Sequence, residues 1–539
     1  MPKTHDIVIR GGMLYDGTGG PSVRGDVAID ADRIAAVGTI TERGARELDA
    51  SGLAVAPGFI NMLSWATDTL FADGRSQSDI RQGVTLEVFG EGWSLGPLNE
   101  RMKKERLEQQ GDIKYDITWT TLDEALQALV ARGISTNIAS FVGATTVRMH
   151  EVADDDRPPT GAELARMRAH VDKAMRDGAL GVGSSLIYAP AAYASTDELV
   201  ALCAAASPYG GLYISHMRSE GERLLEAIEE LIHIARTARV PAEIYHLKQS
   251  GRTNWPKLDR AIALVEAARA AGVRVSADMY PYEAGATGLS ACFPSWAHDG
   301  GPEALRRRLA DPPQRERIKA EMSRAGEAWE NLYHDAGGPE GILLVSFKNE
   351  ALKPLTGKTL ARIARERGGD PRDVAMDLVR EDESRVGMIA FVGSKANLAR
   401  ESGLPWMSFG SDAGSIAPEG VFLKSQPHPR TYGTFARVLG HFVRDLHALT
   451  LEDAVRKMTS VPATNLSLAG RGSLAAGQFA DVVAFDPATI RDHATYEQPH
   501  QYATGMRHVL VNGTPVLFDG EHTDARPGRV VRGKGAERS

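Results

Sequence analysis

Residues 211–246 read GLYISHMRSEGERLLEAIEELIHIARTARVPAEIYH, and this stretch decides the fold. A short apolar run ends in His216, an amphipathic pattern with helical spacing follows over residues 222–238, and a second apolar run ends in His246. Short apolar strands alternating with amphipathic helices are typical of parallel sheets. The stretch therefore predicts one complete strand–helix–strand unit.

The same alternation continues on both sides of this stretch. A second helical pattern covers residues 258–271. Further strand candidates are residues 86–89, 136–142, 179–184, 273–277, 342–347, 388–392 and 406–409. About eight such units over roughly 400 residues predict an α/β fold, a (β/α)8 TIM barrel, whose active site lies at the carboxyl ends of the strands.

The two ends of the chain differ from this middle part. Residues 1–57 and 470–539 are rich in short β-forming runs that glycine and aspartate interrupt, including an Asn512-Gly513 turn. We expect them to form one small composite β-sandwich domain beside a barrel made of residues 58–469. Residues 286–340 are long, charged and poor in strand signals, which predicts an insertion near the barrel mouth.

Composition and charge exclude several classes of protein. The 539 residues carry a net charge of −8 with an isoelectric point near 6.0, so no basic field favours nucleic acid. No apolar run reaches the roughly 18 residues that a membrane span needs. The first residues lack a signal-peptide pattern, and only Cys203 and Cys292 occur. We expect a cytoplasmic protein that acts on a small molecule.

His216 and His246 each follow a strand, and the two strands are consecutive. Parallel neighbouring strands deliver such residues to the same rim, and imidazole is a common zinc ligand. Asp412 follows the run WMSFG, where the last barrel strand should end. A carboxylate there can accept a proton from a metal-activated water and return it to the leaving amine. The pattern thus predicts a metal-dependent hydrolase.

Several motifs give the chain a specific resemblance. PGFI, QGVT, SHMRSE, YHLKQSG, DMYPY, GSDAG and HPRTYGTF occur in this order. In this respect the sequence resembles the N-acyl-D-amino-acid deacylases (D-aminoacylases) of the amidohydrolase superfamily over nearly its whole length. The resemblance implies an amidohydrolase barrel, zinc, and hydrolysis of an N-acyl-D-amino acid to a D-amino acid and a carboxylate.

The chain departs from the family pattern at the metal motifs. After PGFI the family has Asp-x-His-x-His, whereas Leu63 and Trp65 stand in place of the two histidines. The family often has a cysteine after QGVT, where this chain has Glu91 in VFGEGW. Glu91 can supply the anionic ligand. We therefore predict one zinc ion per chain, bound by Glu91, His216 and His246, with Asp412 as general base and acid.

Four residues are candidates for binding a substrate carboxylate. Lys248 lies two residues after His246, and Arg430 lies in the HPR motif, where the resemblance implies a carboxylate-binding arginine. Arginine offers a two-pronged donor and lysine a compact charge. Tyr280 and Tyr282 in DMYPY can donate hydroxyl groups.

Other interpretations remain open at this point. The barrel supports many reactions, so a cyclic amide, a dipeptide or a carbamate is an alternative substrate. The segment ALGVGSS (179–185) contains no lysine to be carbamylated, which disfavours the cyclic amide. Loss of the His-x-His motif is also what a non-catalytic binding protein of this fold would show. The sequence leaves homo-oligomerisation open.

Overall fold

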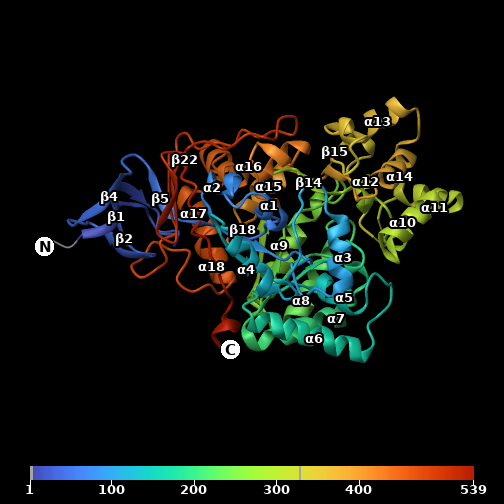
Figure 1. The fold of residues 1–539 in the computed structure, drawn as a ribbon, viewed down its shortest axis with the longest axis horizontal. Helices are drawn as coiled ribbons and strands as arrows, with labels where there is room; N and C mark the ends of the chain where they lie inside the picture. Colours follow the sequence, from blue (N-terminus) through green and yellow to red (C-terminus); the bar gives the residue numbers. More distant parts are fainter. Residues whose placement is uncertain (1–3, 327–328, 539) are drawn as a thin grey trace.

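The computed structural model describes residues 4–326 and 329–538, which fall into a β-rich unit, a barrel and an insertion (Figure 1). Along the long axis, β1 to β5 lie at one end together with β22, and α10 to α14 lie at the other. The barrel and its helices lie between these two parts. The α/β barrel that the sequence predicted is confirmed.

Parallel strands form the barrel wall. They are β6 (Phe59–Asn61), β7 (Val84–Phe89), β8 (Asn137–Ser140), β9 (Val142–Gly143), β10 (Gly181–Ser185), β11 (Leu212–His216), β12 (Ala242–Ile244), β13 (Val275–Met279) and β18 (Met407–Phe409). β8 and β9 flank Phe141 and follow one another in the same wall position, so the wall has eight positions. The amide of Met62 donates to the carbonyl of Phe409 at 3.3 Å, which joins the last strand to the first.

Helices pack around the barrel, and the longer ones bury an apolar face. They are α1 (Thr67–Ala72), α2 (Gln77–Ile80), α3 (Glu100–Gln109), α4 (Leu122–Arg132), α5 (Ala144–Glu151), α6 (Gly161–Arg176), α7 (Thr196–Ala206), α8 (Leu224–Ala238), α9 (Leu258–Ala270), α15 (Lys395–Ser402), α16 (Arg430–Arg437), α17 (Leu451–Met458) and α18 (Ser460–Asn465). α4 and α6 each begin with a capping box, in which a threonine and a glutamate satisfy exposed backbone amides. The helical patterns at 222–238 and 258–271 correspond to α8 and α9.

The insertion is longer than the sequence predicted. Its four-stranded antiparallel sheet contains β14 (Ala284–Gly288), β15 (Ile342–Ser346), β16 (Lys358–Thr359) and β17 (Gly387–Phe391). Its helices are α10 (Gly301–Ala310), α11 (Pro312–Met322), α12 (Leu332–Asp335), α13 (Leu360–Arg367) and α14 (Pro371–Asp382). The interpretation of residues 342–347 and 388–392 as barrel strands was therefore wrong. These strands pack over a hydrophobic core of the insertion's own.

Strands from both ends of the chain join one nine-stranded sheet. They are β1 (Thr4–Leu14), β2 (Val23–Asp30), β3 (Arg33–Gly38), β4 (Arg43–Asp49), β5 (Ala54–Pro57), β19 (Val482–Phe485), β20 (Met506–Val511), β21 (Thr514–Phe518) and β22 (Glu521–His522). β5 pairs with β19, which connects the amino-terminal strands to the carboxyl-terminal ones. Asn512 and Gly513 both have positive φ and form the predicted turn between β20 and β21.

The chain after β22 leaves this sheet and runs along the barrel. The amide of Val531 donates to the carbonyl of Ile138 at 2.8 Å, and the amide of Ile138 donates to Arg529 at 2.9 Å. Residues 529–531 therefore contact the wall at β8, whereas the sequence placed residues 470–539 in the β-domain.

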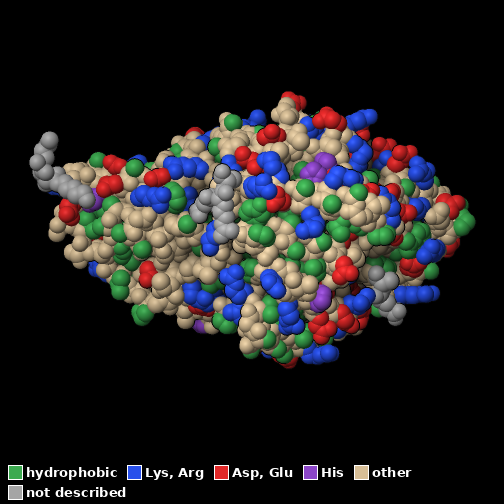
Figure 2. All heavy atoms as spheres, turned by 90° about the horizontal axis from the view of Figure 1, so that it is seen from below, with side chains coloured by type: hydrophobic (Ala, Val, Ile, Leu, Met, Phe, Trp, Pro, Cys, Tyr) green, Lys and Arg blue, Asp and Glu red, His purple; other side chains and the backbone are tan. Residues whose placement is uncertain are grey.

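The surface agrees with the modest net charge. Acidic and basic side chains are interspersed over the face shown in Figure 2. Among the helices within 4–326 and 329–538, none combines the length and the apolar character that crossing a bilayer demands.

Candidate active site

Glu91, His216 and His246 converge at the carboxyl-terminal mouth of the barrel. Glu91 Oε1 lies 3.0 Å from His216 Nδ1 and 3.0 Å from His246 Nε2. One ligand atom from each residue lies within 4.8 Å of the others, and all three side chains are buried. The structure thus brings together the three residues that the sequence singled out as metal ligands.

Local backbone geometry explains why these side chains meet. Glu91 follows β7 between Gly90 and Gly92, whose φ values of 109° and 71° turn the chain into the mouth. His246 follows β12 with a φ of 32°, and its amide donates to Asp278 Oδ1 at 2.9 Å. Positive φ at a residue other than glycine is strained and is concentrated at functional sites. The end of β13, through Asp278, therefore fixes the direction of His246.

The donor set fits a zinc ion. Two imidazoles and one carboxylate are a combination that catalytic zinc sites use. His246 Nδ1 lies 2.9 Å from Glu220 Oε1, which leaves Nε2 directed at Glu91. Metal-bound histidines commonly donate their second ring N–H to a carboxylate in this way. Glu91, His216 and His246 are therefore the residues that would hold zinc.

Glu220 was not predicted from the sequence, although it lies in the SHMRSE motif. It is buried, and its Oε1 accepts from Lys248 Nζ at 2.7 Å. Burial opposes its ionisation, but Lys248 and the two histidines hold the pKa of Glu220 below its ordinary value. The signal that could have found it is a carboxylate four residues after the ligand His216. Lys248 is thus engaged beside the metal ligands.

Asp412 and Arg430 form a second charged group in the same mouth. Arg430 Nη2 lies 2.8 Å from Asp412 Oδ2, and both residues are largely buried. Burial raises the pKa of Asp412, and Arg430 acts against this rise. Arg430 also lies 4.4 Å from the ring centroid of Tyr280. The predicted base and the predicted carboxylate-binding arginine are therefore direct partners.

Residues 63–65, which stand in place of the family's His-x-His motif, are hydrogen-bonded through their backbone to the loop that carries Asp412. The amide of Asp412 donates to the carbonyl of Leu63 at 2.8 Å, and the amide of Trp65 donates to Ala413 at 2.9 Å. Leu63 is completely buried in the barrel core, and Gly410 provides the close approach beside it. The segment thus keeps a structural function although Leu63 and Trp65 offer no ligand atoms.

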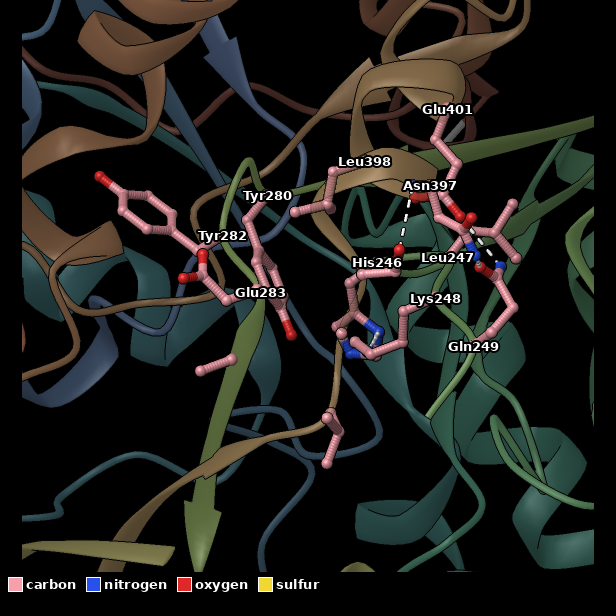
Figure 3. A pocket seen from close by; sticks show the side chains of 14 residues that line it. His246, Leu247, Lys248, Gln249, Tyr280, Tyr282, Glu283, Asn397, Leu398 and Glu401 are labelled. Atoms are coloured by element: carbon pink, nitrogen blue, oxygen red, sulfur yellow. Dashed lines mark hydrogen bonds between the residues drawn. The ribbon is translucent and has the colours of Figure 1, made fainter. Parts of the chain in front are cut away.

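The two predicted tyrosines lie differently. In Figure 3 the ring of Tyr280 points toward His246 and Lys248, whereas Tyr282 points away from them. Lys248 Nζ lies 5.5 Å from the Tyr280 ring centroid. The Tyr282 hydroxyl instead donates to Asp492 at 3.3 Å. Both tyrosines line the pocket beside His246, but only Tyr280 is directed at His246 and Lys248.

The insertion contributes a cation that the sequence did not indicate. Arg385 precedes β17, is exposed, and lies 5.0 Å from the ring centroid of Tyr188. Tyr188 in turn packs edge-on against His216, with 5.4 Å between ring centroids. Arg385 therefore lies over the same mouth. Its position depends on the insertion's fold, which no local motif reveals.

Comparison with known proteins identifies the family. The profile of the amidohydrolase family matches residues 316–517. The D-aminoacylase of Alcaligenes xylosoxydans xylosoxydans is 36% identical over 531 residues, which are 98% of this chain and 97% of that protein. The chain belongs to the D-aminoacylase family of amidohydrolases. The resemblance that the sequence motifs indicated is thereby confirmed.

Two further members of the D-aminoacylase family support this assignment. The N-acyl-D-aspartate deacylase of Alcaligenes xylosoxydans xylosoxydans is 33% identical over 98% of this chain and 95% of its own length. The crystal structure of N-acyl-D-glutamate deacylase from Bordetella bronchiseptica holds zinc and a phosphonate that mimics the tetrahedral intermediate. It superposes with a TM-score of 0.81 at 30% identity, over 98% of this chain and 100% of that one.

Proposed function

We propose that this chain hydrolyses the amide bond of N-acyl-D-amino acids with one zinc ion held by Glu91, His216 and His246. The observation that carries the proposal is the convergence of these buried donors on a single carboxylate oxygen, at 3.0 Å each, in a member of the D-aminoacylase family. Zinc supplies Lewis acidity, which polarises a carbonyl and activates water for attack. The remaining steps belong to side chains of this chain.

Asp412 moves the proton. Its carboxylate accepts a proton from the attacking water and then gives it to the departing nitrogen, so one residue is first base and then acid. Burial raises the pKa of Asp412, which makes its carboxylate a stronger base than an exposed aspartate. Arg430 keeps the charged form accessible through the 2.8 Å ion pair. In this pair the Asp412 carboxylate is therefore a stronger base than an exposed aspartate and is still kept ionised by Arg430.

Arg430 also supports binding of a substrate carboxylate. Its Nε and Nη1 atoms are buried and have no hydrogen-bond partner among residues 4–326 and 329–538. Buried donors left unpaired are costly, and a substrate carboxylate supplies the charged acceptor that such N–H groups bind most strongly. Tyr280 lies against both Arg430 and Lys248 and holds these cations at one side of the mouth.

The experiment that tests this function compares enantiomers. Purified enzyme is incubated with N-acetyl derivatives of several D-amino acids and with the matching L-forms, and the released amino acid is quantified. We expect release from D-substrates only, with about one zinc ion per chain after dialysis against metal-free buffer. Zinc-loaded protein that releases nothing from any D-substrate would move the assignment to another amidohydrolase reaction. A His246→Ala variant that keeps its zinc and its activity would contradict the metal site.

We also infer a cytoplasmic location. Cys203 and Cys292 are free and buried, which suits a reducing compartment. Fractionation of the producing cells tests this location. Light scattering of the purified protein tests the homo-oligomer that the sequence left open.

A further inference from the structure

Trp65 contacts one of the candidate metal ligands directly. Its indole Nε1 donates a hydrogen bond of 2.8 Å to Glu91 Oε2. The other carboxylate oxygen, Oε1, faces His216 and His246. An indole has a single N–H donor and no acceptor. The two oxygens of Glu91 therefore have different partners, one an indole and the other the pair of imidazoles.

The backbone of Trp65 is held in place by a hydrogen bond, although its ring borders solvent. The Trp65 amide is held by the carbonyl of Ala413 at 2.9 Å, next to Asp412. The side chain remains 37% exposed, unlike the fully buried Leu63. Tryptophan combines an apolar ring with one hydrogen-bond donor, so the N–H group explains why this large, partly exposed side chain lies at the barrel mouth.

We propose that Trp65 is a positioning residue that holds Oε2 of Glu91 and so presents Oε1 alone to the metal ion. The proposal rests on the proposed zinc site. An N–H group carries a partial positive charge, and hydrogen bonds to ionised acceptors are stronger than neutral ones. The indole thus partly compensates the carboxylate charge at the oxygen that points away from the histidines. Without this donor, the carboxylate is free to rotate about its last bond.

The test compares two tryptophans that make the same bond in different places. Trp65→Phe removes the donor and keeps an aromatic ring. Trp296→Phe is the matched control, because Trp296 Nε1 donates to Glu321 Oε2 at 2.9 Å in the insertion. Zinc affinity is measured by competition with a chelator, independently of turnover. We expect zinc to bind about 10- to 100-fold more weakly to Trp65→Phe, as for other groups that orient metal ligands, and unchanged to Trp296→Phe.

A spectroscopic measurement separates positioning from a general loss of structure. Cobalt replaces zinc, and its visible bands weaken as the number of bound atoms increases. Trp65→Phe should show weaker bands than the wild type, because both oxygens of Glu91 become available, while circular dichroism stays unchanged. Unchanged affinity and an unchanged cobalt spectrum in a folded Trp65→Phe would overturn the proposal. If the wild type releases no amino acid from any D-substrate, but Trp65→Phe still differs from it in zinc affinity and cobalt spectrum, only the proposed function is refuted.

A second group of candidate metal ligands lies on the outer helices, away from the mouth. His150 Nδ1 lies 2.9 Å from Glu151 Oε1, and His170 Nε2 lies 3.1 Å from the same oxygen. The two rings are 4.2 Å apart between centroids. Arg166 binds the other oxygen of Glu151. This arrangement repeats that of Glu91, in which two imidazoles share one oxygen and a separate donor holds the second.

The geometry points to a second site for a zinc-class ion, at His150, Glu151 and His170. Within the described part of the chain, only this group and the one at Glu91 bring together three ligand atoms within 4.8 Å. The side chains are 20%, 8% and 27% exposed, which lets an ion enter from solvent. The histidines lie on α5 and α6, so an ion here links these two helices.

Zinc titration of the metal-free protein tests this site. The wild type should bind one ion tightly and a second more weakly, whereas His170→Asn should bind only the first. His233→Asn is the control, because His233 is an exposed histidine on α8, a helix that carries none of the three ligands. With one zinc ion bound per chain, we expect the wild type, His170→Asn and His233→Asn to have equal deacylase activity. A second ion that His170→Asn still binds, or one that the wild type never binds, would overturn this site.

Discussion

Arg430 and Asp412 form a buried ion pair in which Nη2 lies 2.8 Å from Oδ2. Their side chains are 3% and 11% exposed. Removing one partner of a buried pair leaves an uncompensated charge, which commonly costs about 3–5 kcal/mol. The proposed base and the proposed carboxylate-binding residue are thus coupled. A substitution at either position changes the electrostatics of the other, and experiments have to separate the two effects.

Replacing Asp412 by asparagine preserves shape and removes the proton acceptor. General acid–base groups contribute about 10² to 10⁴-fold, so turnover should fall at least about a hundredfold. Zinc content should remain near one ion per chain, because the proposed ligands are Glu91, His216 and His246 and do not include Asp412. Atomic absorption and steady-state kinetics on the same preparation measure both. Loss of zinc would make Asp412 a ligand, and retained activity would assign the base elsewhere.

The acid limb of the pH profile should report Asp412. The base works when ionised, so activity is lost as the pH falls through its pKa. Burial raises that pKa, so the limb should lie above the value of about 3.9 that is usual for aspartate. Arg430→Met removes the cation that opposes the rise and should shift the limb of kcat to higher pH. Arg430→Lys keeps the charge and should shift it less.

Zinc occupancy has to be measured at each pH of that series, because metal affinity itself falls as the pH is lowered. A limb that stays in place, or moves to lower pH, in a zinc-loaded Arg430→Met would separate Arg430 from the base.

The barrel could be predicted because its strands and helices have different hydrophobic periods. Two strand assignments failed for a physical reason. β15 and β17 have the same short apolar composition as barrel strands, but they pair antiparallel with each other and with β16 and β14. Neither the direction of a strand nor its partner is encoded in its own five residues. β6 has only three residues, too few for a pattern to emerge.

The same distinction holds within the site. His216 and His246 could be predicted because residues at the ends of neighbouring parallel strands meet at one rim. Glu91 was predicted from the family resemblance, because it stands where the family often has a cysteine. The contact between Trp65 and Glu91 depends on how two loops turn after their strands. From the sequence, Trp65 was therefore interpreted only as a residue that stands in place of a family histidine. Its hydrogen-bonding function requires the three-dimensional arrangement.

Arg385 should contribute to substrate binding without affecting chemistry. It is exposed over Tyr188, which packs against His216, so it is placed to meet a substrate carboxylate at the mouth. In Arg385→Gln we expect KM to rise about tenfold with little change in kcat, which corresponds to about 1.4 kcal/mol. Arg380→Gln, an exposed arginine on α14, is the control. A fall in kcat at unchanged KM would instead connect Arg385 to the reaction step.

Glu220 should control zinc affinity through His246. Its Oε1 lies 2.9 Å from His246 Nδ1 and 2.7 Å from Lys248 Nζ, so a carboxylate orients the ring while a cation compensates its charge. Glu220→Gln keeps the size of the side chain but weakens the acceptor, and its loss of charge leaves Lys248 uncompensated beside the site. Groups that orient metal ligands typically contribute about 10- to 100-fold in metal affinity, so zinc should bind that much more weakly to this variant.

The matched control is Glu222→Gln, two residues away and partly exposed, which should bind zinc like the wild type. Chelator competition measures both variants. If added zinc fully restores the turnover of Glu220→Gln, the residue acts through metal affinity, and unchanged affinity with lost turnover would place Glu220 in the reaction itself.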